Sequence, residues 1–213
     1  KGNLDIVEST TPVGTTEKMA QWMADLHPDL TYPHDKCEVA DISVAHCPER
    51  MLPGKIIEEV VNNPRVIGGM TRKCAQRALS LYRIVVQGEC KVTNARTAEL
   101  SKLSENAYRD VNIAFANELS VICDKHKINV WELIQMANLH PRVEILSPGP
   151  GVGGHCIAVD PWFIVDGAPA EAKIIRAARE INDAKPEFVC EKVAERARSL
   201  VKPPGPSAES LLL

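Results

Sequence analysis

Residues 96–126 read RTAELSKLSENAYRDVNIAFANELSVICDKH and contain neither glycine nor proline. Apolar side chains recur at Leu100, Leu103 and Ala107, which is the spacing of one face of a helix. The stretch therefore predicts a single long helix, and this helix divides the chain into two parts of different character.

The part before the helix alternates short apolar segments with helical ones. We expect strands at residues 3–9, 41–47, 65–68 and 90–93. We expect helices at residues 15–26, 56–61 and 71–86, with Thr15 or Thr16 capping the first and Thr71 the last. This alternation is typical of parallel βαβ units.

The part after the helix is helical apart from one glycine-rich loop at residues 147–161. Further helices are predicted at residues 130–139 and 171–200, the latter kinked or interrupted by Pro186. The predicted fold class is thus α/β, with a partial Rossmann-like parallel sheet followed by an all-α domain with a long helix.

The domain boundaries follow from this change of pattern. We predict a sheet domain over residues 1–94, a helical domain over 95–202 and a tail over 203–213. A strand begins almost at the first residue, and the tail KPPGPSAESLLL is proline-rich and without periodicity, so we expect a fragment.

Composition excludes several classes of protein. The net charge of -3 and pI of about 6.1 give no reason to expect a nucleic-acid surface. No apolar run reaches the roughly 20 residues of a membrane helix, and the first ten residues lack the pattern of a signal peptide. Seven irregularly spaced cysteines are typical of reduced thiols, so we expect a cytoplasmic protein without a membrane partner.

The glycine-rich loop reads PGPGVGGHCIAVDP over residues 148–161 and allows two interpretations. Gly149, Gly151 and Gly154 match the dinucleotide pattern G-x-G-x-x-G, but that pattern needs a strand before it and a helix directly after it. The alternative is a flexible backbone that presents Cys156 as a nucleophile, its thiolate and later oxyanion stabilised by nearby amides. A buried structural cysteine is the plainer possibility.

The long helix carries a second, polar face. Its members are Glu99, Lys102, Asn106, Arg109 and Asn117. Such a stripe is commonly a solvated surface, but a lysine and an asparagine one turn apart could also stabilise a developing oxyanion.

A zinc cluster is the remaining possibility for ligand-forming side chains. His34, Cys37, His46 and Cys47 are the residues concerned. Adjacent residues on a strand point to opposite faces, and the chain has no paired Cys-x-x-Cys. We therefore predict no metal site.

Several motifs together resemble the UDP-glucose/GDP-mannose dehydrogenase family. They are ESTTPVG (8–14), CPER-x-LPG (47–54), AEL-x-KL-x-EN (98–106), NVWELI (129–134), HPRV (140–143) and GPGVGGHCIAVDPWF (149–163). The His-Cys-Ile form of the cysteine motif resembles the N-acetylhexosamine branch. The resemblance implies two hydride transfers to NAD that oxidise C6 of UDP-N-acetylmannosamine to the uronate, with UDP-N-acetylglucosamine as the alternative substrate.

The resemblance also implies roles for individual residues. Cys156 would form a thiohemiacetal and then a thioester. Lys102 and Asn106 would hold the oxygen that becomes negative, and Asp160 would position Lys102 or water. Thr10 and Glu49 match the family's water and base positions. A second acidic residue of some members is Pro53 here, which leaves Glu49 to act alone or with a water.

Binding residues and partners follow from the same resemblance. The implied substrate-binding residues are Arg50, Arg142, His155, Gly151 and Gly153. The implied cofactor-binding residues are Thr10, Pro12, Glu49 and Cys156. The family forms homodimers through its long helix, here about residues 96–126.

The family's dinucleotide glycine fingerprint and its C-terminal domain are absent from these residues. We therefore expect little dehydrogenase activity from this chain alone. The non-catalytic alternative is a dimerising helical module.

Overall fold

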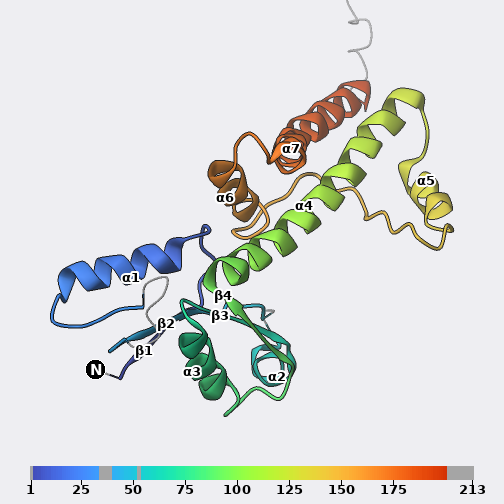
Figure 1. Ribbon diagram of the computed structural model, residues 1–213. Helices are drawn as coiled ribbons and strands as arrows, with labels where there is room; N and C mark the ends of the chain where they lie inside the picture. The colour runs from blue at the N-terminus through green and yellow to red at the C-terminus, as the bar shows by residue number, and fades with distance from the viewer. Residues whose placement is uncertain (1, 34–39, 52–53, 201–213) are drawn as a thin grey trace, which may run out of the picture. The chain divides into compact units, whose positions relative to one another are not determined.

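The predicted long helix is α4, Ala95–His126, in a computed structural model that describes residues 2–33, 40–51 and 54–200 (Figure 1). The chain divides into two units, and α4 contributes to both. One unit comprises residues 1–109 and 154–176, and the other comprises residues 110–153 and 177–213. No helix within the described ranges is both long and apolar enough to cross a membrane.

The first unit contains a four-stranded sheet in the order β1-β2-β3-β4. The strands are β1 Leu4–Val7, β2 Ser43–His46, β3 Arg65–Gly69 and β4 Cys90–Asn94. The pairs β1/β2 and β3/β4 are parallel, which confirms the α/β class.

The pair β2/β3 is antiparallel, so the expectation of parallel pairing throughout is wrong at this point. The helix between these strands, α2 (Ile56–Asn62), has no buried residue. Because α2 does not pack across the sheet as a crossover helix would, β3 starts at the end of the sheet where β2 stops.

Helices cover the two faces of this sheet. Val44 of β2 packs in a cluster with Ala20 of α1 (Thr15–Leu26), whereas the adjacent Ala45 packs with Ala78 of α3 (Arg72–Tyr82). Successive strand residues point to opposite faces, so α1 and α3 lie on opposite sides of the sheet, as Figure 1 shows. The helix predicted to reach residue 86 ends at Tyr82.

The predicted N-cap of α3 is confirmed, whereas the predicted N-cap of α1 is wrong. Thr71 caps α3, because its hydroxyl accepts a 3.2 Å hydrogen bond from the Cys74 N–H. Neither Thr15 nor Thr16 caps α1, since both residues are already helical and the N-cap is Gly14 at a φ of 89°.

Strand β3 lies directly against the first turn of α4. A Cβ atom built on Gly68 would stand 2.5 Å from the Ala98 Cβ and 2.5 Å from the Asn94 carbonyl oxygen. Only a residue without a side chain permits this approach, which fixes the start of α4 against the sheet.

The second unit contains the later part of α4, helix α5 (Val130–Ala137) and most of α7 (Lys173–Leu200). Asn129 caps α5 through hydrogen bonds from the Trp131 and Glu132 N–H groups. Helix α7 continues through Pro186, which therefore does not interrupt it.

The first unit also contains a helix that the sequence analysis did not predict. This is α6, Asp160–Gly167, with Pro161 in its first turn, where proline is well tolerated.

Candidate active site

The polar face of α4 meets the start of α6 in the first unit. The Asn106 Nδ2 atom donates a 2.6 Å hydrogen bond to the carboxylate of Asp160, which is buried. Burial raises the pKa of Asp160, while the Asn106 hydrogen bond and the positive charge of Lys102 lower it. The ammonium of Lys102 is thus close enough to Asp160 to interact with it electrostatically.

The predicted nucleophile begins the turn that leads into α6. The backbone carbonyl of Cys156 accepts hydrogen bonds from the Val159 N–H (3.2 Å) and the Asp160 N–H (2.9 Å). The turn therefore connects Cys156 to the carboxylate that Asn106 holds. Cys156 is exposed, unlike the buried Cys47, Cys74 and Cys123, which argues against a purely structural thiol.

The remaining predicted catalytic residues follow β1 and β2. These strands are parallel, so the loops carrying Thr10 and Glu49 leave the same edge of the sheet, where open α/β sheets bind nucleotides. Thr10 and Glu49 are both half-buried. Within the described ranges, the hydroxyl oxygen of Thr11 is buried without a hydrogen-bond partner, so this edge has unused capacity to bind a polar group.

The loop after β2 is attached to α4 by an ion pair. Arg50, predicted to bind substrate, pairs with Glu105, the residue before Asn106. Glu49 accepts a hydrogen bond from the Met51 N–H. The structure thus brings this loop to the part of α4 that carries Lys102 and Asn106.

Glu99 has a function that the sequence analysis missed. It is 1% exposed and accepts hydrogen bonds from the Gly14 N–H, the Thr16 N–H and the Thr16 hydroxyl. The polar stripe includes Glu99, one turn before Lys102, but the stripe alone does not indicate that this residue is buried against another helix. A solvated surface is the wrong interpretation for this member of the stripe.

One neighbour of Glu99 is itself buried and polar. His46 is 0% exposed, and neither ring nitrogen has a hydrogen-bond partner within the described residues. Burial lowers the pKa of His46, and the charge of Glu99 opposes that shift.

Three of the predicted substrate-binding residues belong to the second unit: Arg142, Gly151 and Gly153. Arg142 is exposed in a short loop closed by Asn138, whose side chain accepts from the Ile145 N–H (2.8 Å) and donates to the Ile145 carbonyl (3.0 Å). Asn138 was not singled out from the sequence.

The glycine-rich loop is held by a buried polar network in the second unit. The Asn117 Oδ1 atom accepts from the Gly149 N–H (2.8 Å), and its Nδ2 atom donates to Asn182 (2.8 Å). Asn182 donates to Asp110 (2.8 Å), which also pairs with Arg179 at 2.7 Å. Asn117 is fully buried, so it too departs from the solvated-surface interpretation.

Local structure argues against the dinucleotide interpretation of the glycine-rich loop. Residues 143–146 form no strand, and the next helix starts only at Asp160. The strand–turn–helix context of a dinucleotide fingerprint is therefore absent here. Gly151 (φ 143°) lies against the ring of Pro186, where a Cβ would stand 2.8 Å from the Cγ atom. Gly153 and His155 are exposed.

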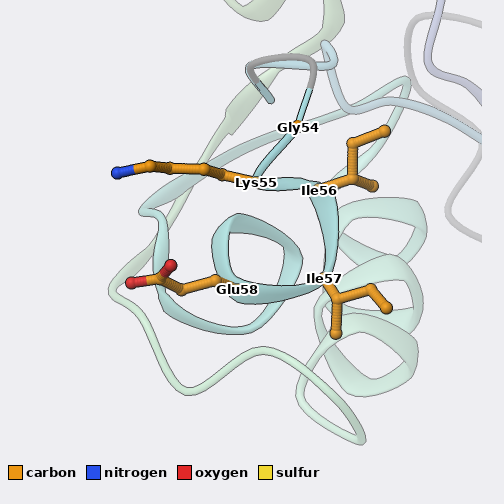
Figure 2. A pocket seen from close by; sticks show the side chains of 5 residues that line it. All are labelled: Gly54, Lys55, Ile56, Ile57 and Glu58. Carbon is orange, nitrogen blue, oxygen red and sulfur yellow. The ribbon is translucent and has the colours of Figure 1, made fainter.

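The weighed zinc cluster and one surface hollow complete the description of the site. His34 and Cys37 of the weighed zinc cluster, like Pro53, lie outside the described residues, and His46 and Cys47 are buried. An open hollow of about 520 Å³ is lined by residues 54–58 at the start of α2. Figure 2 shows Lys55 and Glu58 extending to one side of the first turn of α2 and Ile56 and Ile57 to the other. No predicted catalytic residue lines the hollow.

An α/β layer followed by long helices is the architecture of the Rossmann-type sugar-nucleotide dehydrogenases whose solved structures this chain resembles. The solved structure of UDP-D-ManNAc dehydrogenase from Pyrococcus horikoshii resembles this chain with a TM-score of 0.82 and 46% sequence identity. The resemblance covers 92% of this chain and 45% of that one.

The chain belongs to the UDP-glucose/GDP-mannose dehydrogenase family. Residues 1–86 match the family's NAD binding domain, and residues 96–184 match its central domain. The match to the NAD binding domain confirms, for the family, the cofactor predicted from the sequence.

Two relatives are similar over almost the whole chain. UDP-N-acetyl-D-mannosamine dehydrogenase of Campylobacter jejuni is 64% identical over 203 residues, which are 95% of this chain and 50% of that protein. NDP-N-acetyl-D-galactosaminuronic acid dehydrogenase of Ralstonia nicotianae is 61% identical, over 95% and 48% respectively. The chain thus spans about half the length of the relatives that it matches.

Proposed function

We propose that the protein containing this chain oxidises C6 of UDP-N-acetylmannosamine to the carboxylate with NAD. The observation that carries the proposal is the connection of Cys156, Asp160, Asn106 and Lys102 through hydrogen bonds and charge within one unit. The 64% identity to the Campylobacter jejuni enzyme supports the choice of sugar.

Two NAD molecules, bound one after the other, would each accept one of the two hydrides that leave C6. Thr10, Pro12 and Glu49 would hold NAD, because they follow the parallel strands β1 and β2 at one edge of the sheet and the buried Thr11 hydroxyl there is free to form a hydrogen bond. Cys156 is the remaining predicted contact with the cofactor.

The residues of the chain would act in sequence on the sugar. The Lys102 ammonium and the Asn106 amide stabilise the oxygen on C6 as the alcohol loses its proton and its first hydride. The Cys156 thiol then adds to the aldehyde: its sulfur bonds to C6 and its proton passes to the C6 oxygen. The thiohemiacetal that forms loses this proton and the second hydride to become a thioester. Water cleaves the C–S bond, which releases the carboxylate and restores the thiol.

Proton transfer to and from water falls to Glu49 and Asp160 in this scheme. Burial raises the pKa of Asp160, which keeps this carboxyl closer to the pH range in which it can exchange a proton.

The sugar nucleotide would be bound by the predicted substrate-binding residues, which are Arg50, His155, Arg142, Gly151 and Gly153. We also propose domains at residues 1–94 and 95–202 and a homodimer through α4.

A hybrid protein tests the proposal. In this hybrid, the matching 203-residue segment of the Campylobacter jejuni relative is replaced by the corresponding residues of this chain. We expect about two NADH per uronate formed from UDP-N-acetylmannosamine, and lower rates with the N-acetylglucosamine and N-acetylgalactosamine epimers. Equal or higher rates with another epimer would reject the choice of sugar, whereas a folded hybrid without turnover would reject the proposal as a whole.

The 213-residue chain alone serves as the comparison. We propose that it has little activity, since it spans half of its relatives. Turnover of the isolated chain at the rate of the hybrid would contradict this.

A further inference from the structure

We propose that Glu99 is a positioning residue that fixes the Thr10 loop to the helix carrying Lys102 and Asn106. The meaning of this link for catalysis rests on the proposed function, but the link itself does not. It lies wholly within the first unit.

The Glu99 carboxylate replaces the side-chain cap that α1 lacks. The N-cap of α1 is Gly14, which has no side chain to accept a hydrogen bond. Glu99 Oε2 accepts from the Gly14 N–H at 2.6 Å, and Oε1 accepts from the Thr16 N–H at 2.8 Å. A carboxylate at a helix N-terminus is favoured both by these hydrogen bonds and by the helix dipole.

The burial of this contact distinguishes it from an ordinary surface bond. Glu99 is 1% exposed and Thr16 is 0% exposed, and the Thr16 hydroxyl donates a third bond to Oε1 at 2.6 Å. Neither ring nitrogen of the buried His46 has a hydrogen-bond partner within the described ranges, so the carboxylate bonds α1 rather than this histidine. A buried carboxylate is tolerated only when it is well bonded, and α1 supplies the bonds.

The contact between Glu99 and α1 matters for the site because Glu99 lies on the same helix as Lys102 and Asn106. Lys102 and Asn106 follow Glu99 by three and seven residues, which places all three on one face of α4. Gly14 follows Thr10 by four residues, and the intervening turn is closed by the Thr15 hydroxyl, which donates to the Pro12 carbonyl at 2.7 Å. One side chain therefore sets the distance between the Thr10 loop and the Lys102 face.

The same two helices offer a matched control. Arg96 of α4 donates two hydrogen bonds to Glu17 of α1, at 2.7 and 2.6 Å, but their side chains are 66% and 30% exposed, whereas Glu99 is 1% exposed. Exposed pairs contribute little to stability, whereas buried charge-assisted bonds contribute more. Glu99→Gln and Glu17→Gln thus compare a buried and an exposed link between the same helices.

Amide hydrogen exchange of the 213-residue chain tests the inference without any need for turnover. In Glu99→Gln we expect the Gly14 and Thr16 amides, which donate to the Glu99 carboxylate, to exchange about tenfold faster or more relative to the amides of α3, because local opening of this contact costs less free energy. Glu17→Gln should leave them within about twofold of the original protein.

Two variants at Thr16 apply if Glu99→Gln does not fold. Thr16→Val should accelerate exchange of the Gly14 amide, and Thr16→Ser, which keeps the hydroxyl, should retain the slow rate. Unchanged exchange in both Glu99→Gln and Thr16→Val, or an equal effect of Glu17→Gln, would overturn the inference. Failure of the hybrid to turn over substrate would leave this outcome unaffected, so the two proposals fail separately.

Discussion

Asn106 on α4 and Asp160 at the start of α6 are joined by a 2.6 Å hydrogen bond, although 54 residues separate them in the chain. The bond connects the helix that carries Lys102 to the turn that carries Cys156. It shows how two motifs that the sequence presents separately come together in one unit of the structure.

The first prediction concerns the pH dependence of stability at Asp160. Burial raises the pKa of this carboxyl in the folded protein, so the folded state binds a proton more readily than the unfolded state. The protonated Asp160 carboxyl therefore contributes to the free energy of unfolding at pH values below the ordinary pKa of aspartate. This contribution is lost as the pH rises through the raised pKa of the folded protein. Relative to Asp160→Asn, the original protein should become less stable as the pH rises from the ordinary aspartate pKa of about 4 to the raised pKa of the folded protein.

Chemical denaturation of both proteins across this range measures the difference. Subtracting the two free energies of unfolding removes the pH dependence of the groups that both proteins share. One of these groups is Asp110, because burial also raises its pKa. A difference that is constant with pH, or that changes in the opposite direction, would show that Asp160 is not held as described.

The second prediction concerns the contact of β3 with α4. Gly68→Ala places a Cβ within 2.5 Å of Ala98 Cβ and the Asn94 carbonyl, so one of these backbones must move. We expect a loss of about 1–3 kcal/mol in the free energy of unfolding, which is typical of overpacking.

Gly167→Ala is the matched control for this substitution. A Cβ at Gly167, within α6, meets nothing within 4 Å, so the change should be neutral or stabilising by up to about 1 kcal/mol. Urea denaturation compares the two variants, and equal effects would contradict the described packing of β3.

The third prediction concerns the anchor of the glycine-rich loop. Asn117→Ala removes the acceptor of the Gly149 N–H and the donor to Asn182, both in a buried network. Unpaired buried groups cost about 1–3 kcal/mol each, so we expect a marked loss of stability and fast exchange of the Gly149 amide.

The adjacent Glu118 provides the comparison, because it is exposed on the same helix. Glu118→Ala should change the free energy of unfolding by less than about 0.5 kcal/mol. If the Gly149 amide exchanges at the same rate in both variants, Asn117 does not anchor the loop.

Much of the fold could be predicted because its signals are local. The glycine- and proline-free run of α4 and the Thr71 cap of α3 are each visible within a few residues. Helix α6 was missed because PWFIV is a short apolar, partly β-branched run, and such a run does not distinguish a strand from a buried helix. The antiparallel β2/β3 pair depends on the path of the chain rather than on either strand.

The sequence was enough to predict the candidate catalytic residues, but not the buried residues and long-range contacts that hold them in place. Cys156, Lys102 and Asn106 stand in motifs, and their roles stay predictions. The burial of Glu99 and Asn117 could not be read from the polar stripe, since a helix face becomes a core only when another element covers it. Long-range partners such as Thr16 for Glu99 follow from tertiary packing alone.

The most direct measurement for the proposed chemistry is the location of the covalent intermediate. The hybrid protein is mixed with UDP-N-acetylmannosamine and NAD, denatured in acid during turnover and analysed by peptide mass spectrometry. We predict a sugar-nucleotide adduct on the peptide that contains Cys156. Cys156→Ala should give neither adduct nor uronate. Cys190 is a second exposed thiol, and Cys190→Ala should retain both. Uronate formation by Cys156→Ala at an undiminished rate would contradict the account.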